Sequence, residues 1–183
     1  AYRIDGKPSY ALEGSIFVAG VAIQWLRDQL GLIEHAADTA EAFARTQGET
    51  HGVYVVPAFT GLGAPYWQPQ VRGLITGLTL DSDKDHLITA FLQSVAYQTR
   101  ALLDAMAADG APVTTLRVDG GMVVNEAFCQ FLCDLLDVPV QRPADVETTV
   151  RGAGVLAAMG AGLFANLAEA AALWQLGALS VLR

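Results

Sequence analysis

Residues 116–128, LRVDGGMVVNEAF in one-letter code, contain the pattern with the clearest chemical use in this sequence. An aspartate and two glycines follow an apolar run, and a segment with apolar residues at helical spacing begins at Asn125. This order predicts a strand, a tight turn and a helix. Glycines let a ligand approach bare backbone, and a helix start offers free N–H donors. The segment alone therefore predicts either a ligand-binding turn or an ordinary strand-to-helix connection.

A second candidate surface lies on the first expected helix, residues 16–32. Its apolar stripe is expected to consist of Phe17, Val18, Val21, Trp25 and Leu26. A separate face, at spacing i, i+3, i+4 and i+7, is formed by Gly20, Ile23, Gln24 and Arg27. A glycine inside a helix costs about 1 kcal/mol relative to alanine. This face is therefore expected either to admit a flat ligand against the backbone or to pack closely against another helix.

The loop at residues 60–69 contains two glycines, two prolines and the adjacent aromatics Tyr66 and Trp67. Loops of this composition are rigid and often carry function. A structural Ω-loop held by its own aromatics explains the composition equally well, so both interpretations stay open.

Histidines and cysteines give no indication of a metal site. His35, His51 and His86 have no acidic or cysteine partner at ligand spacing, and we expect them on the surface. Cys129 and Cys133 lie one helical turn apart, too few for a zinc site or a disulfide framework. We expect both cysteines to pack in the interior of a protein from a reducing compartment.

Strands and helices must position these residues. Strands are expected at residues 9–14, 53–57, 72–79, 116–118 and 138–141. Helices are expected at residues 16–32, 38–45, 86–107, from 125, from about 149, and at the start of 167–183. Small residues dominate 152–161, which predicts close packing of that helix on a sheet or a second backbone. No repeat or linker is visible, so residues 1–183 are expected to form a single domain.

Composition narrows the class of protein. The chain of 183 residues is 52% hydrophobic and 16% charged, enough for one sizeable core and too apolar for disorder. A net charge of −8 and a pI near 4.7 argue against general binding to nucleic acid or anionic membranes. The longest apolar run, about residues 152–165, is shorter than the ~20 residues of a membrane-spanning helix, and no signal peptide is visible. We expect a cytoplasmic protein.

Several motifs, in order, resemble the glycerol kinases within the FGGY carbohydrate kinases. They are YALEGS at residues 10–15, IQWLRD at 23–28, PAFTGLGAPYW at 57–67 and RVDGG at 117–121. The spacing between G-x-I-x-G-L at residues 73–78 and His86-Leu87 also resembles a signature of that family. The resemblance extends over about residues 10–167 and implies the C-terminal, nucleotide-binding half of such a kinase.

The resemblance implies an α/β fold of the actin-like, ribonuclease H-like ATPases, with a mixed sheet flanked by helices. It implies that the full-length enzyme phosphorylates glycerol to glycerol 3-phosphate, using ATP with Mg²⁺ and releasing ADP. Such kinases place the catalytic cleft between two domains. Their N-terminal half supplies the polyol contacts, the catalytic aspartate and a threonine-rich loop, and these motifs do not occur in the sequence. No catalytic residue is therefore expected here, and a homodimer or homotetramer is implied by resemblance only.

Family positions that contact the nucleotide correspond to Gly20, Ile23, Gln24, Ala36, Gly121 and Asn125. Asn125 fits chemically, because a carboxamide offers both a donor and an acceptor to an adenine edge. It can equally be an ordinary helix N-cap. Asp119 is expected either to help organise a hydrated magnesium ion or only to shape the turn.

Two alternatives remain open. One is another FGGY sugar kinase, of the xylulose or ribulose type, because the choice of sugar resides mostly in the N-terminal half. The loop at residues 60–67 favours glycerol. The other alternative is a non-catalytic nucleotide-binding or scaffold domain that has kept the fold.

Overall fold

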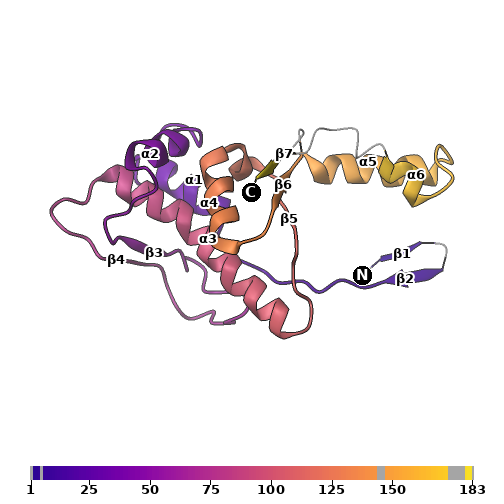
Figure 1. Cartoon of the computed structure of the whole chain (residues 1–183), viewed down its shortest axis with the longest axis horizontal. Helices are drawn as coiled ribbons and strands as arrows, with labels where there is room; N and C mark the ends of the chain where they lie inside the picture. Colours follow the sequence, from indigo (N-terminus) through magenta and orange to yellow (C-terminus); the bar gives the residue numbers. More distant parts are fainter. Residues whose placement is uncertain (1, 5, 144–146, 173–179, 183) are drawn as a thin grey trace.

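The computed structural model of this chain describes residues 2–4, 6–143, 147–172 and 180–182. Its helices are α1 (Gly20–Asp28), α2 (Asp38–Thr46), α3 (Lys84–Ala108), the 3-10 helix η1 (Gly121–Val124), α4 (Glu126–Leu136), α5 (Thr148–Gly160) and α6 (Leu167–Ala172). Its strands are β1 (Tyr2–Ile4), β2 (Lys7–Ser9), β3 (Tyr54–Val56), β4 (Leu74–Thr76), β5 (Leu116–Arg117), β6 (Val140–Arg142) and β7 (Ser180–Leu182). Figure 1 shows α1 to α4 in a central body, from which the β1–β2 hairpin and the α5–α6 pair project to the same side.

The described strands form small sheets. β1 pairs with β2, and β3 with β4, in two antiparallel ladders. The third sheet has the order β5-β6-β7, with β5 parallel and β7 antiparallel to β6. This mixed sheet, next to the helical body, agrees with the predicted α/β class.

Helix α3 is the centre of the body. The Asp83 side chain caps its start by accepting hydrogen bonds from the Asp85 and His86 N–H groups, at 2.9 and 3.0 Å. Its first half is buried on almost every side, because α1, α2, α4 and β3 all pack against it. The largest fully buried side chains of this core are Phe91, Leu26, Ile88 and Leu92. The long helix and its cap agree with the sequence prediction.

The first helix is shorter than the predicted residues 16–32. Phe17 and Val21, assigned to its apolar stripe, are 41% and 55% exposed. Val18 and Leu26 of that stripe are buried as predicted, and Ala22 and Ile23 are buried as well. The backbone before α1 stays extended because its carbonyl groups have distant partners: Ser15 accepts from the Ala64 N–H at 2.9 Å, and Val18 from Gln98 Nε2 at 3.5 Å. The Ala22 N–H, which in the predicted helix would donate to the Val18 carbonyl, donates to the Ala19 carbonyl at 2.9 Å.

The predicted strand at residues 9–14 is also displaced. The strand ends at Ser9, where it pairs with Tyr2 across the Gly6 turn. The following residues run extended along the outside of the molecule, and Tyr10 is 84% exposed.

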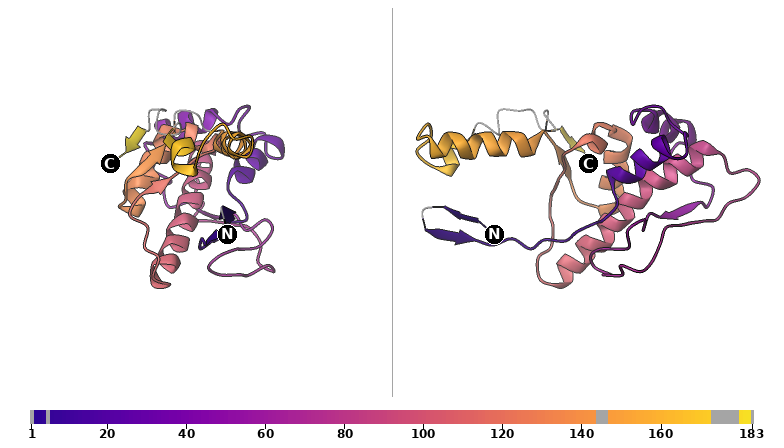
Figure 2. Two further views of the ribbon diagram at one scale, coloured as in Figure 1. Left: turned by 90° about the vertical axis from the view of Figure 1, so that its right-hand side faces the viewer. Right: turned by 180° about the vertical axis from the view of Figure 1, so that it is seen from behind.

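The close packing predicted for residues 152–161 is wrong for the described part of the chain. No described residue of α5 is buried. A Cβ added at Gly152, Gly154 or Gly160 would meet no atom within 4 Å. The right-hand view of Figure 2 shows α5 and α6 extending away from the body. The small residues therefore leave an open helix surface rather than a tight contact.

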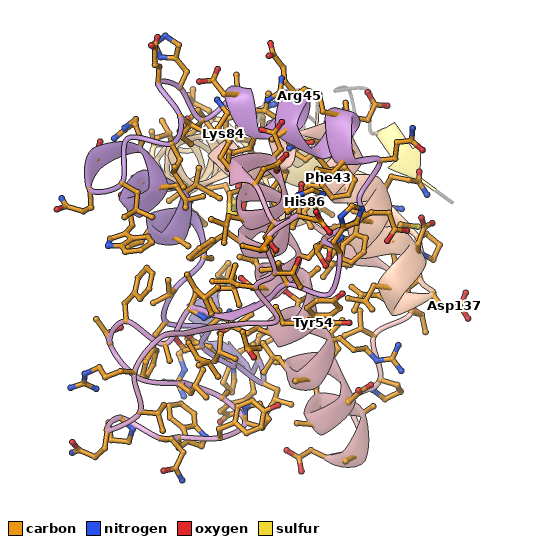
Figure 3. All side chains as sticks on the ribbon, turned by 90° about the vertical axis from the view of Figure 1, so that its left-hand side faces the viewer. Phe43, Arg45, Tyr54, Lys84, His86 and Asp137 are labelled. Carbon is orange, nitrogen blue, oxygen red and sulfur yellow. The ribbon has the colours of Figure 1, made fainter. Side chains whose placement is uncertain are left out.

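One of the histidines departs from its expected surface position. His86 is buried, its Nδ1 accepts a hydrogen bond from the Asp83 N–H at 3.2 Å, and its ring lies 4.2 Å from that of His51. It completes the helix cap, a role that the residue type did not indicate. Figure 3 shows His86 in the first turns of α3.

The two cysteines follow the prediction. Cys129 and Cys133 are both buried. Burial raises the pKa of the Cys129 thiol. The described residues contain no group of three or more side chains that could hold a metal ion. Among the described helices, none combines the length and apolarity needed to cross a bilayer.

Candidate functional site

A cavity of about 640 Å³ opens between α1, the start of α2 and the glycine turn before α4. Its volume lies within the range of about 300–1,000 Å³ usual for small-molecule sites. The residues selected from the sequence all line it: Gly20, Ile23, Gln24, Ala36, Gly121 and Asn125. Arg27, from the same helix face, and Asp119, from the turn, line it as well.

Helix α1 presents both its first turn and one side to the cavity. Gly20 is its first residue, and no side chain caps this end or places a negative charge in the first turn. The free N–H groups and the helix dipole therefore favour a negatively charged or hydrogen-bond-accepting ligand group here. One turn on, Ile23 is buried as part of the cavity floor, while Gln24 is exposed beside it.

The glycine turn forms the opposite wall. Gly120 has φ +87, a left-handed conformation that favours glycine, and the chain then enters η1. A Cβ added at Gly121 would meet nothing within 4 Å, so its backbone lies open. The sequence prediction contained the turn and the following helix but not the short 3-10 segment between them.

Asn125 connects this wall to α2. Its Oδ1 accepts a hydrogen bond from the Phe128 N–H at 3.1 Å, so it is the N-cap of α4. Its Nδ2 donates to Thr39 Oγ1 at 3.4 Å, across the junction between α4 and α2. The N-cap interpretation is correct, and the same residue also lines the cavity.

Asp119 shapes the turn through a second contact. Its Oδ2 accepts a hydrogen bond from Thr148 Oγ1, the side chain of the first residue of α5. The carboxylate thus links the cavity wall to the start of the α5–α6 arm.

The walls combine an apolar interior with polar groups at a few points. Apolar lining comes from Ala19, Ala37, Ala40, Leu92, Met122 and Val124. At the rim, Arg27 donates to Asp28 through Nε at 2.6 Å, and this hydrogen bond holds the pKa of the Asp28 carboxyl below its usual value. Such a cavity can bind a flat, apolar ring that carries polar edges. Among the described lining residues there is no serine, cysteine or histidine to act as a nucleophile or base.

Sequence reasoning missed the contribution of α2. Thr39, Ala37 and Ala40 line the cavity, although only Ala36 was assigned to it. Helical spacing from Ala36 could not have indicated Ala40, because Ala36 lies before the start of α2. No local signal could have indicated Thr39, because its contact with Asn125 joins residues far apart in the chain.

Comparison with known proteins identifies the family of this chain. Residues 2–161 match the family model described as the FGGY family of carbohydrate kinases, C-terminal domain. Glycerol kinase 1 of Pseudomonas aeruginosa is 57% identical over 175 residues, covering 96% of this chain and 35% of that protein. Glycerol kinase of Geobacillus kaustophilus is 57% identical over 177 residues, covering 96% of this chain and 36% of its own length. The chain therefore spans about a third of these relatives.

Solved structures give the same fold. Plasmodium falciparum glycerol kinase with ADP has a TM-score of 0.79 and 30% identity, over 92% of this chain and 33% of that chain. Xylulose kinase of Lactobacillus acidophilus, at 19% identity and a TM-score of 0.72, covers 92% of this chain and 34% of its own, and shows the fold alone. The predicted actin-like, ribonuclease H-like ATPase fold is confirmed. With the family model matched over residues 2–161, the chain belongs to the FGGY carbohydrate kinases and carries their C-terminal domain.

Proposed function

We propose that this chain is the nucleotide-binding part of an ATP-dependent kinase that phosphorylates glycerol to glycerol 3-phosphate. The observation that carries the proposal is the convergence of the α1 face and the distant glycine turn on one cavity. Support comes from a related glycerol kinase that was solved with ADP. The residues proposed to contact ATP or ADP are Gly20, Ile23, Gln24, Ala36, Gly121 and Asn125.

The cavity chemistry suggests how the nucleotide lies. The apolar walls suit the purine ring, and the carboxamides of Gln24 and Asn125 can each donate to and accept from polar edges. The free N–H groups at the start of α1 and the open backbone at Gly121 suit the ribose and the first phosphates. Binding of this kind positions the nucleotide, and positioning with charge stabilisation accounts for most catalysis in phosphoryl transfer.

The cavity offers one carboxylate, that of Asp119, to a magnesium ion. Mg²⁺ is usually bound through one or two carboxylates, several waters and the substrate phosphates. Asp119 supplies a carboxylate, one oxygen of which already accepts from Thr148. Asp119 would hold the hydrated ion from one side, and the bound ion would neutralise phosphate charge.

The remaining parts of the reaction belong to the rest of the enzyme. Glycerol contacts and the group that deprotonates its hydroxyl are expected from the N-terminal half, so the present chain alone is expected to bind nucleotide weakly and to lack kinase turnover. Closure of the two halves would exclude water from the transferred phosphate. The homodimer or homotetramer, the cytoplasmic location and the single-domain organisation stay predictions.

Glycerol is favoured over the alternative sugars. The curated relatives described above are glycerol kinases at 57% identity, whereas the xylulose kinase structure is 19% identical. A scaffold domain that does not bind nucleotide would have no need to keep every proposed contact residue on one cavity. A panel of polyols and ketoses tested on the full-length kinase would separate the sugar classes.

The proposed contacts are tested by titrating the purified chain with ADP in a calorimeter. Gln24→Ala should weaken ADP binding about 5- to 10-fold, because one polar contact contributes about 1 to 1.5 kcal/mol. The control is Gln70→Ala, at an exposed loop position away from the cavity, which should leave the affinity unchanged. Absence of ADP binding at millimolar concentration, or equal affinities of the two variants, would contradict the proposal.

A further inference from the structure

We propose that Thr39 is a positioning residue, which fixes the Asn125 carboxamide in the one orientation that accepts adenine and disfavours guanine. This inference rests on the proposed function, since it concerns the base-binding part of the same cavity. It adds a residue of α2 that the sequence did not indicate, and it states which purine the cavity selects.

The hydrogen bonds around Asn125 define its orientation without ambiguity. The Phe128 N–H can only donate, so it requires the carboxamide oxygen on its side, at 3.1 Å. The Thr39 hydroxyl donates its proton to the Ala36 carbonyl at 2.7 Å. Its oxygen can then only accept, and it accepts from Asn125 Nδ2 at 3.4 Å. In a flipped carboxamide, Nδ2 would face the Phe128 N–H, so that two donors would meet. Its Oδ1 would face the Thr39 Oγ1, so that two acceptors would meet.

Burial makes this arrangement costly to disturb. Thr39 is only 3% exposed, so water cannot easily replace its hydroxyl as the partner of Asn125. An unpaired polar group at such a position costs about 1–3 kcal/mol. The carboxamide therefore keeps one free N–H and one free lone pair in a fixed arrangement at the cavity wall.

This arrangement complements adenine. An asparagine side chain pairs with adenine by accepting from the exocyclic N6 amine and donating to a neighbouring ring nitrogen. Guanine presents the O6 acceptor where adenine presents its amine, so O6 would face Asn125 Oδ1 and two acceptors would meet. On the Watson–Crick edge, where guanine carries the N1–H donor beside O6, reversal of the carboxamide would relieve the conflict, and Thr39 opposes that reversal.

The test compares ADP with GDP on the whole 183-residue chain by calorimetry. Thr39→Val removes the hydroxyl at nearly constant volume and should lower the ratio of ADP to GDP affinity at least 5-fold. Thr39→Ser restores the hydroxyl and should keep the ratio within 2-fold of the original protein. The matched control is Thr46→Val, because Thr46 also donates to a backbone carbonyl within α2, that of Phe43 at 3.1 Å, away from the cavity.

A purely structural role for Thr39 gives a different result. It would lower the melting temperature and weaken both nucleotides equally in Thr39→Val, leaving the ratio unchanged, which would overturn the inference. An original protein that binds ADP and GDP equally would overturn it too, while leaving the proposed function intact. An original protein that binds neither would overturn both. If Thr39→Val shows no cooperative melt, Thr39→Ala takes its place, with the same expected fall in the ratio.

Discussion

A side chain at Gly20 is expected to reduce nucleotide binding without reducing the stability of the fold. A Cβ added there would lie 3.9 Å from the Met122 side chain, an ordinary contact, and it would enter the cavity. We expect Gly20→Ala to keep the free energy of unfolding within about 1 kcal/mol of the original or to raise it, since alanine is the better helix former. The same variant should weaken ADP binding about tenfold, because the methyl group occupies ligand space. Urea unfolding and calorimetry measure the two effects.

Gly77 provides the opposite case as a control. It has φ +80, and a Cβ added there would clash with the Gly52 carbonyl oxygen. Gly77→Ala should destabilise the protein through backbone strain, while the folded fraction binds ADP normally. A Gly20→Ala variant that loses stability as Gly77→Ala does, or that keeps full affinity, would contradict the role assigned to Gly20.

Single residues show what local sequence could and could not indicate. Gly20 and Gln24 were predictable, because helical spacing alone places them on one face. Thr39 was not, because its role depends on how α2 lies against α4. His86 was placed on the surface, since a residue type does not reveal that its ring completes a helix cap.

At the scale of elements, α2 and α3 are joined by a charged pair at their ends. Arg45 Nε donates to Asp85 Oδ2 at 2.6 Å, and Figure 3 shows Arg45 beside the first turn of α3. This hydrogen bond holds the pKa of Asp85 below its ordinary value of 3.8. Backbone N–H donors likewise lower the pKa values of Asp38 and Asp83.

The lowered pKa values of these carboxyls make the folded protein less stable in acid. Because these carboxyls bind protons less readily when folded, their contribution to stability is complete above the unfolded pKa and disappears as the pH falls through the folded pKa. We expect the urea midpoint to be steady from pH 7 to about 5 and to decrease below about 4. Asp85→Asn should lower the midpoint slightly at pH 7 and flatten the decrease in acid.

A suitable control is Asp104→Asn, which removes an exposed partner of Arg100 within α3. It should leave the urea midpoint at pH 7 unchanged, because exposed pairs of this kind contribute little. A steeper acid decrease in Asp85→Asn than in the original protein would contradict the assignment of Asp85.

Helices with a capping residue or a regular apolar spacing in the sequence were predicted well. Asp83 and the apolar spacing behind it identified α3, and helical spacing identified α2 and α4. The first helix was overestimated, because Ser15 and Val18 give their carbonyls to distant donors, and local periodicity contains no information on such contacts. The 3-10 helix η1 was not predicted, since a double glycine indicates a turn without defining its path.

At the scale of the whole molecule, the α5–α6 arm differs from the body. No described residue of α5 is buried, whereas the first half of α3 is buried throughout. Local stability follows buried apolar contacts, so the arm should open far more readily than the core. We expect amide hydrogen exchange in α5 to be faster than in α3 by at least about a hundredfold in protection factor. Equal protection in the two helices would show that the arm packs against something in solution.

The proposed nucleotide site depends on the whole molecule, because its cavity forms where α1, α2 and the glycine turn meet. The most direct measurement is a titration of the ¹⁵N-labelled chain with ADP, followed by amide chemical shifts. We predict progressive, saturable shifts at Gly20, Gln24, Gly121 and Asn125, with the β1–β2 hairpin unaffected. Shifts confined to other parts of the chain, or none at millimolar ADP, would contradict it.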